Sequence, residues 1–160
     1  MAKSIEAPGA MIALWWRRLS RVPFGKTLFS VMIGRMVPYT GSIGARCEEL
    51  APGYSRWTLR DRRSVRNHLR SIHAVALVNL AEVSSGTAML GALGPGVRGI
   101  VSGLEITYLK KARGLLTAEG RGAVPNFNGT TTTDARCEIK DASGDVVATA
   151  VVRWQLERTE

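Results

Sequence analysis

Glu82 and Asn79 lie three residues apart in residues 71–93, a stretch in which apolar residues fall on nearly every side of a helix. This pattern predicts a helix that is buried all round, with Glu82 and Asn79 on one face. An unpaired acidic side chain in an apolar environment costs several kcal/mol. Glu82 is therefore expected to be solvated, to pair with one of the chain's many arginines, or to be used in catalysis.

His73, in the first turn of the same predicted helix, is a second candidate. It precedes Glu82 by nine residues, which is two and a half turns, or about 13 Å along a helix axis. The two side chains of one chain therefore cannot touch. They can meet only across a symmetric dimer, where the helix start of one subunit faces the middle of the other's helix. The alternative is that His73 is a surface or capping residue.

The chain around this helix predicts strands. In residues 54–62, Trp57 and Leu59 share one face while polar and basic residues share the other. Ser71 is the expected N-cap of the helix, and Gly94–Pro95–Gly96 its end. Two strands, one helix and four strands favour an α+β domain in which an antiparallel sheet curls around the helix. The predicted strands are 44–50, 54–62, 97–110, 114–121, 131–140 and 146–156.

The first 43 residues are expected to form a helical extension. Residues 10–21 and 26–37 predict two short helices, the second stopped by Pro38 and Gly41. They are expected to pack on the main body, with contact to a membrane surface as the alternative. The arginine-rich, acid-poor start also resembles a transit peptide, but its apolar run is too short for a signal peptide.

Length and composition narrow the class of protein. The chain has 160 residues, with 45% hydrophobic and 22% charged residues, which fits one globular domain and excludes a disordered chain, a collagen and a coiled coil. Cys47 and Cys137 have no CxxC partner or histidine-rich neighbourhood. We therefore expect no metal site and no disulfide framework, and a cytoplasmic location.

The net charge of +9 lies entirely in the first half of the chain. Residues 1–70 hold 13 basic and 4 acidic residues, whereas residues 71–160 hold 9 of each. A nucleic acid, an anionic membrane or a phosphate-bearing small molecule would match such a surface. No nucleic acid is expected, because the basic segments carry no helix-turn-helix, zinc or RNA-binding signature and the case rests on charge alone.

Residues 67–82 resemble the signature of the hotdog-fold acyl-CoA thioesterases, in their phenylacetyl-CoA thioesterase-like branch. That signature places an Asn six residues before His-Gly-Gly and an acidic residue nine after the His, and Asn67, His73 and Glu82 match it in type and spacing. Residues 24–46 further resemble an uncharacterised subgroup, sometimes called a domain of unknown function.

The resemblance implies a hotdog domain over residues 44–156 after the extension 1–43, and hydrolysis of an acyl-CoA or related thioester. It also implies a homodimer or homotetramer with its site at the dimer interface. Coenzyme A would be part of the substrate, with no separate cofactor. The alternatives are a hotdog protein that binds an acyl group without hydrolysing it, and a basic protein that binds nucleic acid or an anionic membrane.

The resemblance also assigns roles. The backbone N–H of Ala74 would stabilise the oxyanion, and Glu82 would activate water or attack the carbonyl itself. Asn67 and His73 would hold the thioester or the water, and Asn79 would steady Glu82. The family's His-Gly-Gly is His-Ala-Val in this chain, and Arg70 stands where the family often has Gly. The resemblance therefore fixes neither the size of the acyl group nor the activity. The residues expected to bind the coenzyme A phosphates, unless they form only a solvated basic edge, are Lys110, Lys111, Arg113, Arg66 and Arg70.

Overall fold

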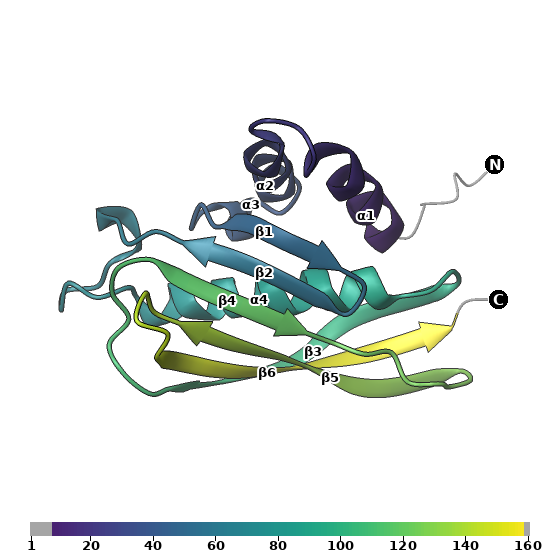
Figure 1. Cartoon of the computed structure of the whole chain (residues 1–160). Helices are drawn as coiled ribbons and strands as arrows, with labels where there is room; N and C mark the ends of the chain where they lie inside the picture. The colour runs from purple at the N-terminus through teal and green to yellow at the C-terminus, as the bar shows by residue number, and fades with distance from the viewer. Residues whose placement is uncertain (1–7, 159–160) are drawn as a thin grey trace.

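The computed structural model describes residues 8–158, and its elements follow the order expected from the sequence (Figure 1). Three helices, α1 (Pro8–Leu19), α2 (Gly25–Met36) and α3 (Pro38–Gly41), precede the sheet. A short 3-10 turn (Arg63–Val65) and the long helix α4 (Ala74–Ala92) separate the second strand from the third. The strands are β1 (Arg46–Ala51), β2 (Tyr54–Leu59), β3 (Val97–Tyr108), β4 (Leu116–Arg121), β5 (Thr130–Lys140) and β6 (Val146–Arg158).

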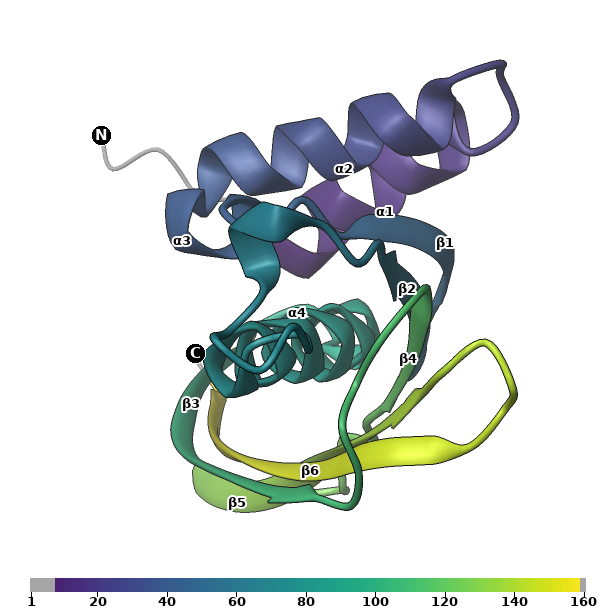
Figure 2. The same cartoon turned by 90° about the vertical axis from the view of Figure 1, so that its left-hand side faces the viewer.

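The six strands form one antiparallel sheet in the order β1-β2-β4-β5-β6-β3. Figure 2 shows the sheet curving around α4, with β2 and β4 on the right, β5 and β6 below and β3 on the left, while α1, α2 and α3 lie above. The sheet approaches the helix closely at Gly120 of β4, where a Cβ atom would clash with the backbone of Ser84. This arrangement is the hotdog fold, and the predicted fold class is confirmed.

The sheet and the N-terminal helices enclose the apolar side chains of helix α4. By length and composition it could cross a membrane, but 67% of the relevant window is buried within the protein. Its apolar character is that of a core helix, in agreement with the predicted burial on all sides.

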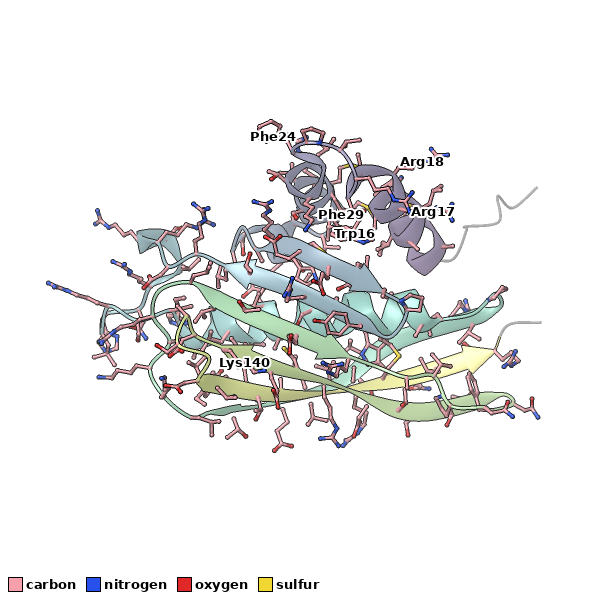
Figure 3. All side chains as sticks on the ribbon, in the orientation of Figure 1. Trp16, Arg17, Arg18, Phe24, Phe29 and Lys140 are labelled. Carbon is pink, nitrogen blue, oxygen red and sulfur yellow. The ribbon has the colours of Figure 1, made fainter. Side chains whose placement is uncertain are left out.

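The N-terminal helices pack on the main body, as expected. Phe29 of α2 is fully buried, with its ring centroid 5.1 Å from that of Trp16 and 6.5 Å from that of Trp57 (Figure 3). The hydroxyl of Ser30 accepts a hydrogen bond from the backbone N–H of Cys47 at 2.9 Å. Helix α2 therefore covers the β1 edge of the sheet.

The start of α4 differs from the expectation. Ser71 is not the N-cap, because its N–H and hydroxyl both donate to the side-chain oxygen of Asn67, which holds the chain in a loop. His73 is the N-cap instead, and its Nδ1 accepts the N–H of Val75 at 3.1 Å. Pro38 also does more than end α2, since it begins the short helix α3.

Cys47 and Cys137 are free and buried, so the expectation that they do not pair is confirmed. Burial raises the pKa of both thiols, that of Cys137 to about 12. Neither thiol is a nucleophile at neutral pH, because the reactive thiolate is not formed.

Candidate active site

The N-terminus of α4 is exposed and presents an unused hydrogen-bond donor. Ala74 is the first helical residue, and its N–H has no hydrogen-bond partner among residues 8–158. The hydroxyl of Tyr108, at the end of β3, donates to the Ala74 carbonyl at 3.3 Å. A free N–H at the positive end of a helix dipole suits a developing negative charge. Because Nδ1 of His73 is an acceptor, the proton of the neutral ring sits on Nε2.

Asn67 organises the loop before α4. Its Oδ1 accepts from the N–H of Leu69 at 2.9 Å and from the N–H and hydroxyl of Ser71, each at 3.2 Å. Only the side-chain NH₂ of Asn67 remains available to a ligand. Arg70 in this loop has φ 55, in the left-handed region that favours glycine.

Glu82 is half-buried, and its carboxylate forms no hydrogen bond or ion pair with the residues that the structure describes. Loss of solvent on burial raises its pKa above the ordinary value of 4.5. It lines a pocket of about 110 Å³ whose other walls include Ile33, Val37 and Trp154. The alternative of an arginine partner within residues 8–158 is therefore wrong. An unpaired carboxylate with a raised pKa in an apolar pocket is suited to accept and return a proton.

Asn79 does not steady Glu82 as expected. Its Nδ2 donates to the carbonyl of Tyr39 in α3 at 2.9 Å, while its buried Oδ1 has no partner among residues 8–158. Asn79 and His73 line a second pocket, of about 240 Å³, with Tyr39 forming part of its wall. Asn79 thus anchors α3 to α4, and its role in any reaction would be at this second pocket.

His73 and Glu82 remain apart within one chain. They line different pockets, and α3 contributes to both, through Tyr39 to the first and Thr40 to the second. The chain alone therefore does not assemble the helix start and the carboxylate into one site.

The loop that contains the predicted cations lies against the motif loop. The N–H of Ile72 donates to the carbonyl of Ala112 at 2.8 Å, and Nη2 of Arg113 lies 3.5 Å from the carbonyl of Leu69. Two segments about 40 residues apart in sequence are joined in this way. The structure therefore brings the predicted phosphate-binding residues to the same end of the molecule as the start of α4.

Two of the five predicted cations already have acidic partners. Nε of Arg66 lies 2.6 Å from a carboxylate oxygen of Asp61. The ammonium of Lys110 lies 2.7 Å from Asp141 and 2.6 Å from Asp145. Both cations are largely neutralised locally, which leaves the exposed side chains of the other three as the stronger candidates: Lys111, Arg113 and Arg70.

Sequence reasoning did not find Tyr39, Tyr108 or Trp154. The indole N–H of Trp154 is buried without a partner among the described residues, and the side chain lines the Glu82 pocket. Gly86, one turn after Glu82, lies beside this ring, and a Cβ there would make an ordinary van der Waals contact with it at 3.8 Å.

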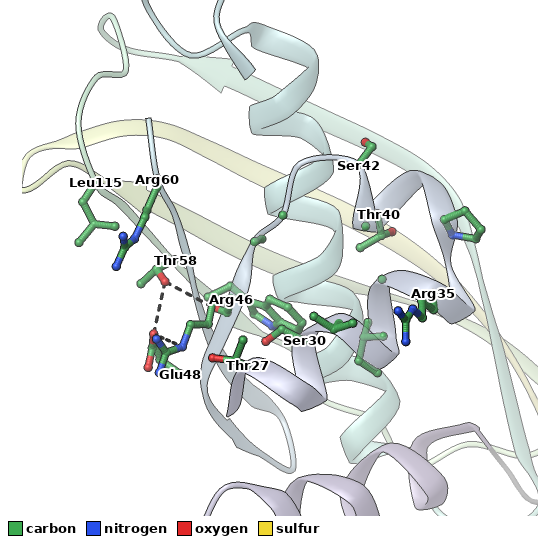
Figure 4. A pocket seen from close by; sticks show the side chains of 18 residues that line it. Thr27, Ser30, Arg35, Thr40, Ser42, Arg46, Glu48, Thr58, Arg60 and Leu115 are labelled. Carbon is green, nitrogen blue, oxygen red and sulfur yellow. Dashed lines mark hydrogen bonds and ion pairs between the residues drawn. The ribbon is translucent and has the colours of Figure 1, made fainter. Parts of the chain in front are cut away.

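A cavity larger than the Glu82 pocket lies beside it. A groove of about 860 Å³ lies between α2, α3 and the strands β1 and β2 (Figure 4). Its polar side carries Glu48, which pairs with Arg46 at 3.3 Å and Lys26 at 3.5 Å. Ile33 and Thr40 line both this groove and the Glu82 pocket. These cavities are neighbours, but the groove holds no group suited to acid–base chemistry that is still unpaired.

Comparison with known proteins adds a family and several similar structures. A family model described as "Domain of unknown function (DUF4442)" matches residues 25–156. A structure designated genomics APC5556 is 29% identical with a TM-score of 0.82, over 93% of this chain and 99% of that one. No curated protein matches the chain.

Two further similar structures bear thioesterase names. A protein of unknown function from Pseudomonas aeruginosa, called a probable thioesterase, is 22% identical with a TM-score of 0.71, over 86% of this chain and 97% of that one. A hypothetical thioesterase from Streptococcus pneumoniae, solved with coenzyme A, is 20% identical with a TM-score of 0.65, over 79% of this chain and 99% of that one. At 22% and 20% sequence identity, the similarity to these two structures establishes the fold of this chain.

Proposed function

Because this chain belongs to the DUF4442 family and has the hotdog fold, we propose that it hydrolyses an acyl-CoA or a related thioester. The observation that carries the proposal is the half-buried carboxylate of Glu82 on the core helix, which has no hydrogen-bond or ion-pair partner among residues 8–158. The thioesterase names of similar structures support the same reaction class.

The reaction follows from two groups. Glu82 takes a proton from water, and the resulting hydroxide attacks the carbonyl carbon of the thioester. The oxyanion accepts a hydrogen bond from the N–H of Ala74 at the start of α4, either in the partner subunit or in the subunit that supplies Glu82. Breakage of the C–S bond releases the thiolate, which receives the proton from Glu82. Direct attack by Glu82, with an anhydride intermediate, remains the second route.

We propose that the site is completed in a homodimer formed through β3. This strand is 12 residues long and, within the part of the chain that the structure describes, pairs only with β6, and its Ile100 is 68% exposed. The other sheet edge is covered by α2, so β3 is the edge open to pairing. Tyr108 places the start of α4 at the end of this edge. Antiparallel pairing of two β3 strands would therefore bring the start of each α4 toward the other subunit.

We expect the purified protein to have twice the 17.3 kDa mass of the chain in light scattering. Ile100→Lys places a charge on the open edge and should shift the protein toward monomer with loss of turnover. Leu115→Lys is the matched control, because Leu115 is also exposed but lies outside β3. A monomeric unmodified protein with full activity would contradict the interface.

Turnover of a panel of acyl-CoAs, followed by release of the thiol, tests the function. The protein's own thiols do not add to the signal of this assay, because both are buried. The same acyl group on dephospho-coenzyme A should show a KM higher by about tenfold, since Arg70, Lys111 and Arg113 would lose a charged partner. Tight binding without release of thiol would instead identify the non-catalytic binding protein.

A further inference from the structure

An exposed apolar ridge runs over the turn between α1 and α2 and along α2. It consists of Val22, Phe24, Leu28 and Val31, which are 49, 87, 50 and 43% exposed. Phe24 precedes α2 with φ 59, a left-handed conformation that is unusual for an aromatic residue. Figure 3 shows Phe24 at the tip of the turn between α1 and α2, directed away from the body of the protein. Leu28 and Val31 continue this ridge along α2 at helical spacing.

The segment that bears the ridge is basic, and one of its cations, Lys26 of α2, pairs with Glu48 of β1 at 3.5 Å. Residues 8–45 contain five basic residues and no acidic one. Arg17, Arg18, Arg21 and Arg35 are exposed and have no acidic partner among residues 8–158, and Figure 3 shows Arg17 and Arg18 on the outer side of α1. The positive potential over this hairpin is therefore not cancelled locally.

We propose that the turn between α1 and α2 docks the protein on an anionic lipid bilayer, with Phe24 and Leu28 inserted at the interface. Apolar side chains flanked by basic ones gain both from burial among lipid chains and from attraction to anionic head groups. A second copy of this chain fits less well, because it would place one unneutralised cationic hairpin against another. The outer face of the sheet, by contrast, carries acids and bases together, as in the pairs of Lys140 with Glu138 and Arg153 with Asp134.

Sedimentation with vesicles tests the docking. The full chain should bind vesicles of phosphatidylcholine with phosphatidylglycerol, not vesicles of phosphatidylcholine alone. Binding should fall in 1 M NaCl, where the screening length is about 3 Å. Phe24→Asn suits the left-handed backbone and should lower binding by about tenfold. Arg17→Gln with Arg18→Gln should also lower it about tenfold. Arg136→Gln with Arg153→Gln removes the same charge from the sheet and should leave binding within about twofold.

A label at the tip gives an independent readout. Phe24→Cys introduces one exposed thiol into a chain whose own thiols are buried, so a polarity-sensitive dye reacts there alone. Its emission should shift to the blue on anionic vesicles and not on neutral ones.

Absence of binding to anionic vesicles, or equal loss in the sheet control, overturns the proposal. A change in oligomeric mass caused by Phe24→Asn, without vesicle binding by the unmodified chain, would assign the ridge to a second copy instead. These results are independent of thioester turnover, because the ridge residues lie outside the Glu82 pocket.

Discussion

Glu82→Gln is expected to lower kcat by at least about 100-fold, the scale for losing a general base. The amide keeps nearly the same shape but cannot take a proton from water or attack the thioester. Affinity for the substrate should change little, because the coenzyme would be held by Arg70, Lys111 and Arg113, which lie outside the Glu82 pocket. Stopped assays on the purified variant with the preferred acyl-CoA measure both quantities.

The same variant should be at least as stable as the unmodified protein. Burial raises the pKa of Glu82 above that of the unfolded chain. Such an acid favours folding below the unfolded pKa, and this contribution is lost as pH rises through the folded value. At neutral pH the ionised carboxylate therefore lowers the free energy of unfolding, and glutamine removes this destabilisation. A melting temperature at or above that of the unmodified protein is the expected result.

The pH dependence of turnover gives a further check on Glu82. The ionised form is the active base, so kcat/KM should fall as pH decreases through an inflection above 4.5, the ordinary value for glutamate. Glu138→Gln is the matched control, because Glu138 is exposed on β5. A Glu82→Gln protein that melts earlier and turns over normally would remove Glu82 from the reaction.

The sequence predicted the fold through its burial pattern. Residues 71–93 read as a helix apolar on all sides, and α4 is enclosed by the sheet and α1–α3. Alternation in 54–62 placed Trp57 and Leu59 inward, and both are buried. These predictions succeeded because the spacing of apolar residues along the sequence indicates which faces of a helix or strand are buried.

The fine structure of the site could not be read in the same way. Asn79 binds the carbonyl of Tyr39, 40 residues earlier, and no local pattern encodes such a contact. Ser71 and His73 both suit an N-cap by type, and the choice fell to His73 because the side chain of Asn67 holds Ser71. Lys110 was predicted to bind a phosphate of coenzyme A, but it pairs with Asp141 and Asp145 in the turn between β5 and β6. Each of these outcomes depends on tertiary contacts.

Ala74→Pro should lower turnover by about 10²–10³, the effect of losing one oxyanion donor. Proline removes the backbone N–H, and the first helical position tolerates it. His73 has φ −65 and ψ 141, a conformation that a following proline favours. The fold should therefore persist, as circular dichroism and melting would verify. Ala74→Gly is the control, because it retains the N–H and should keep most of the activity.

Mixed dimers then decide whether the two groups come from different subunits. A heterodimer with one Ala74→Pro chain and one Glu82→Gln chain, isolated with two affinity tags, contains one complete site if the N–H of one subunit serves the carboxylate of the other. Its turnover should reach about half that of the unmodified dimer, since one site of two is intact. If each site lay within one chain, both sites would be defective and the heterodimer would be as inactive as its parents. The separation of His73 and Glu82 into two pockets of one protomer leads us to expect restoration.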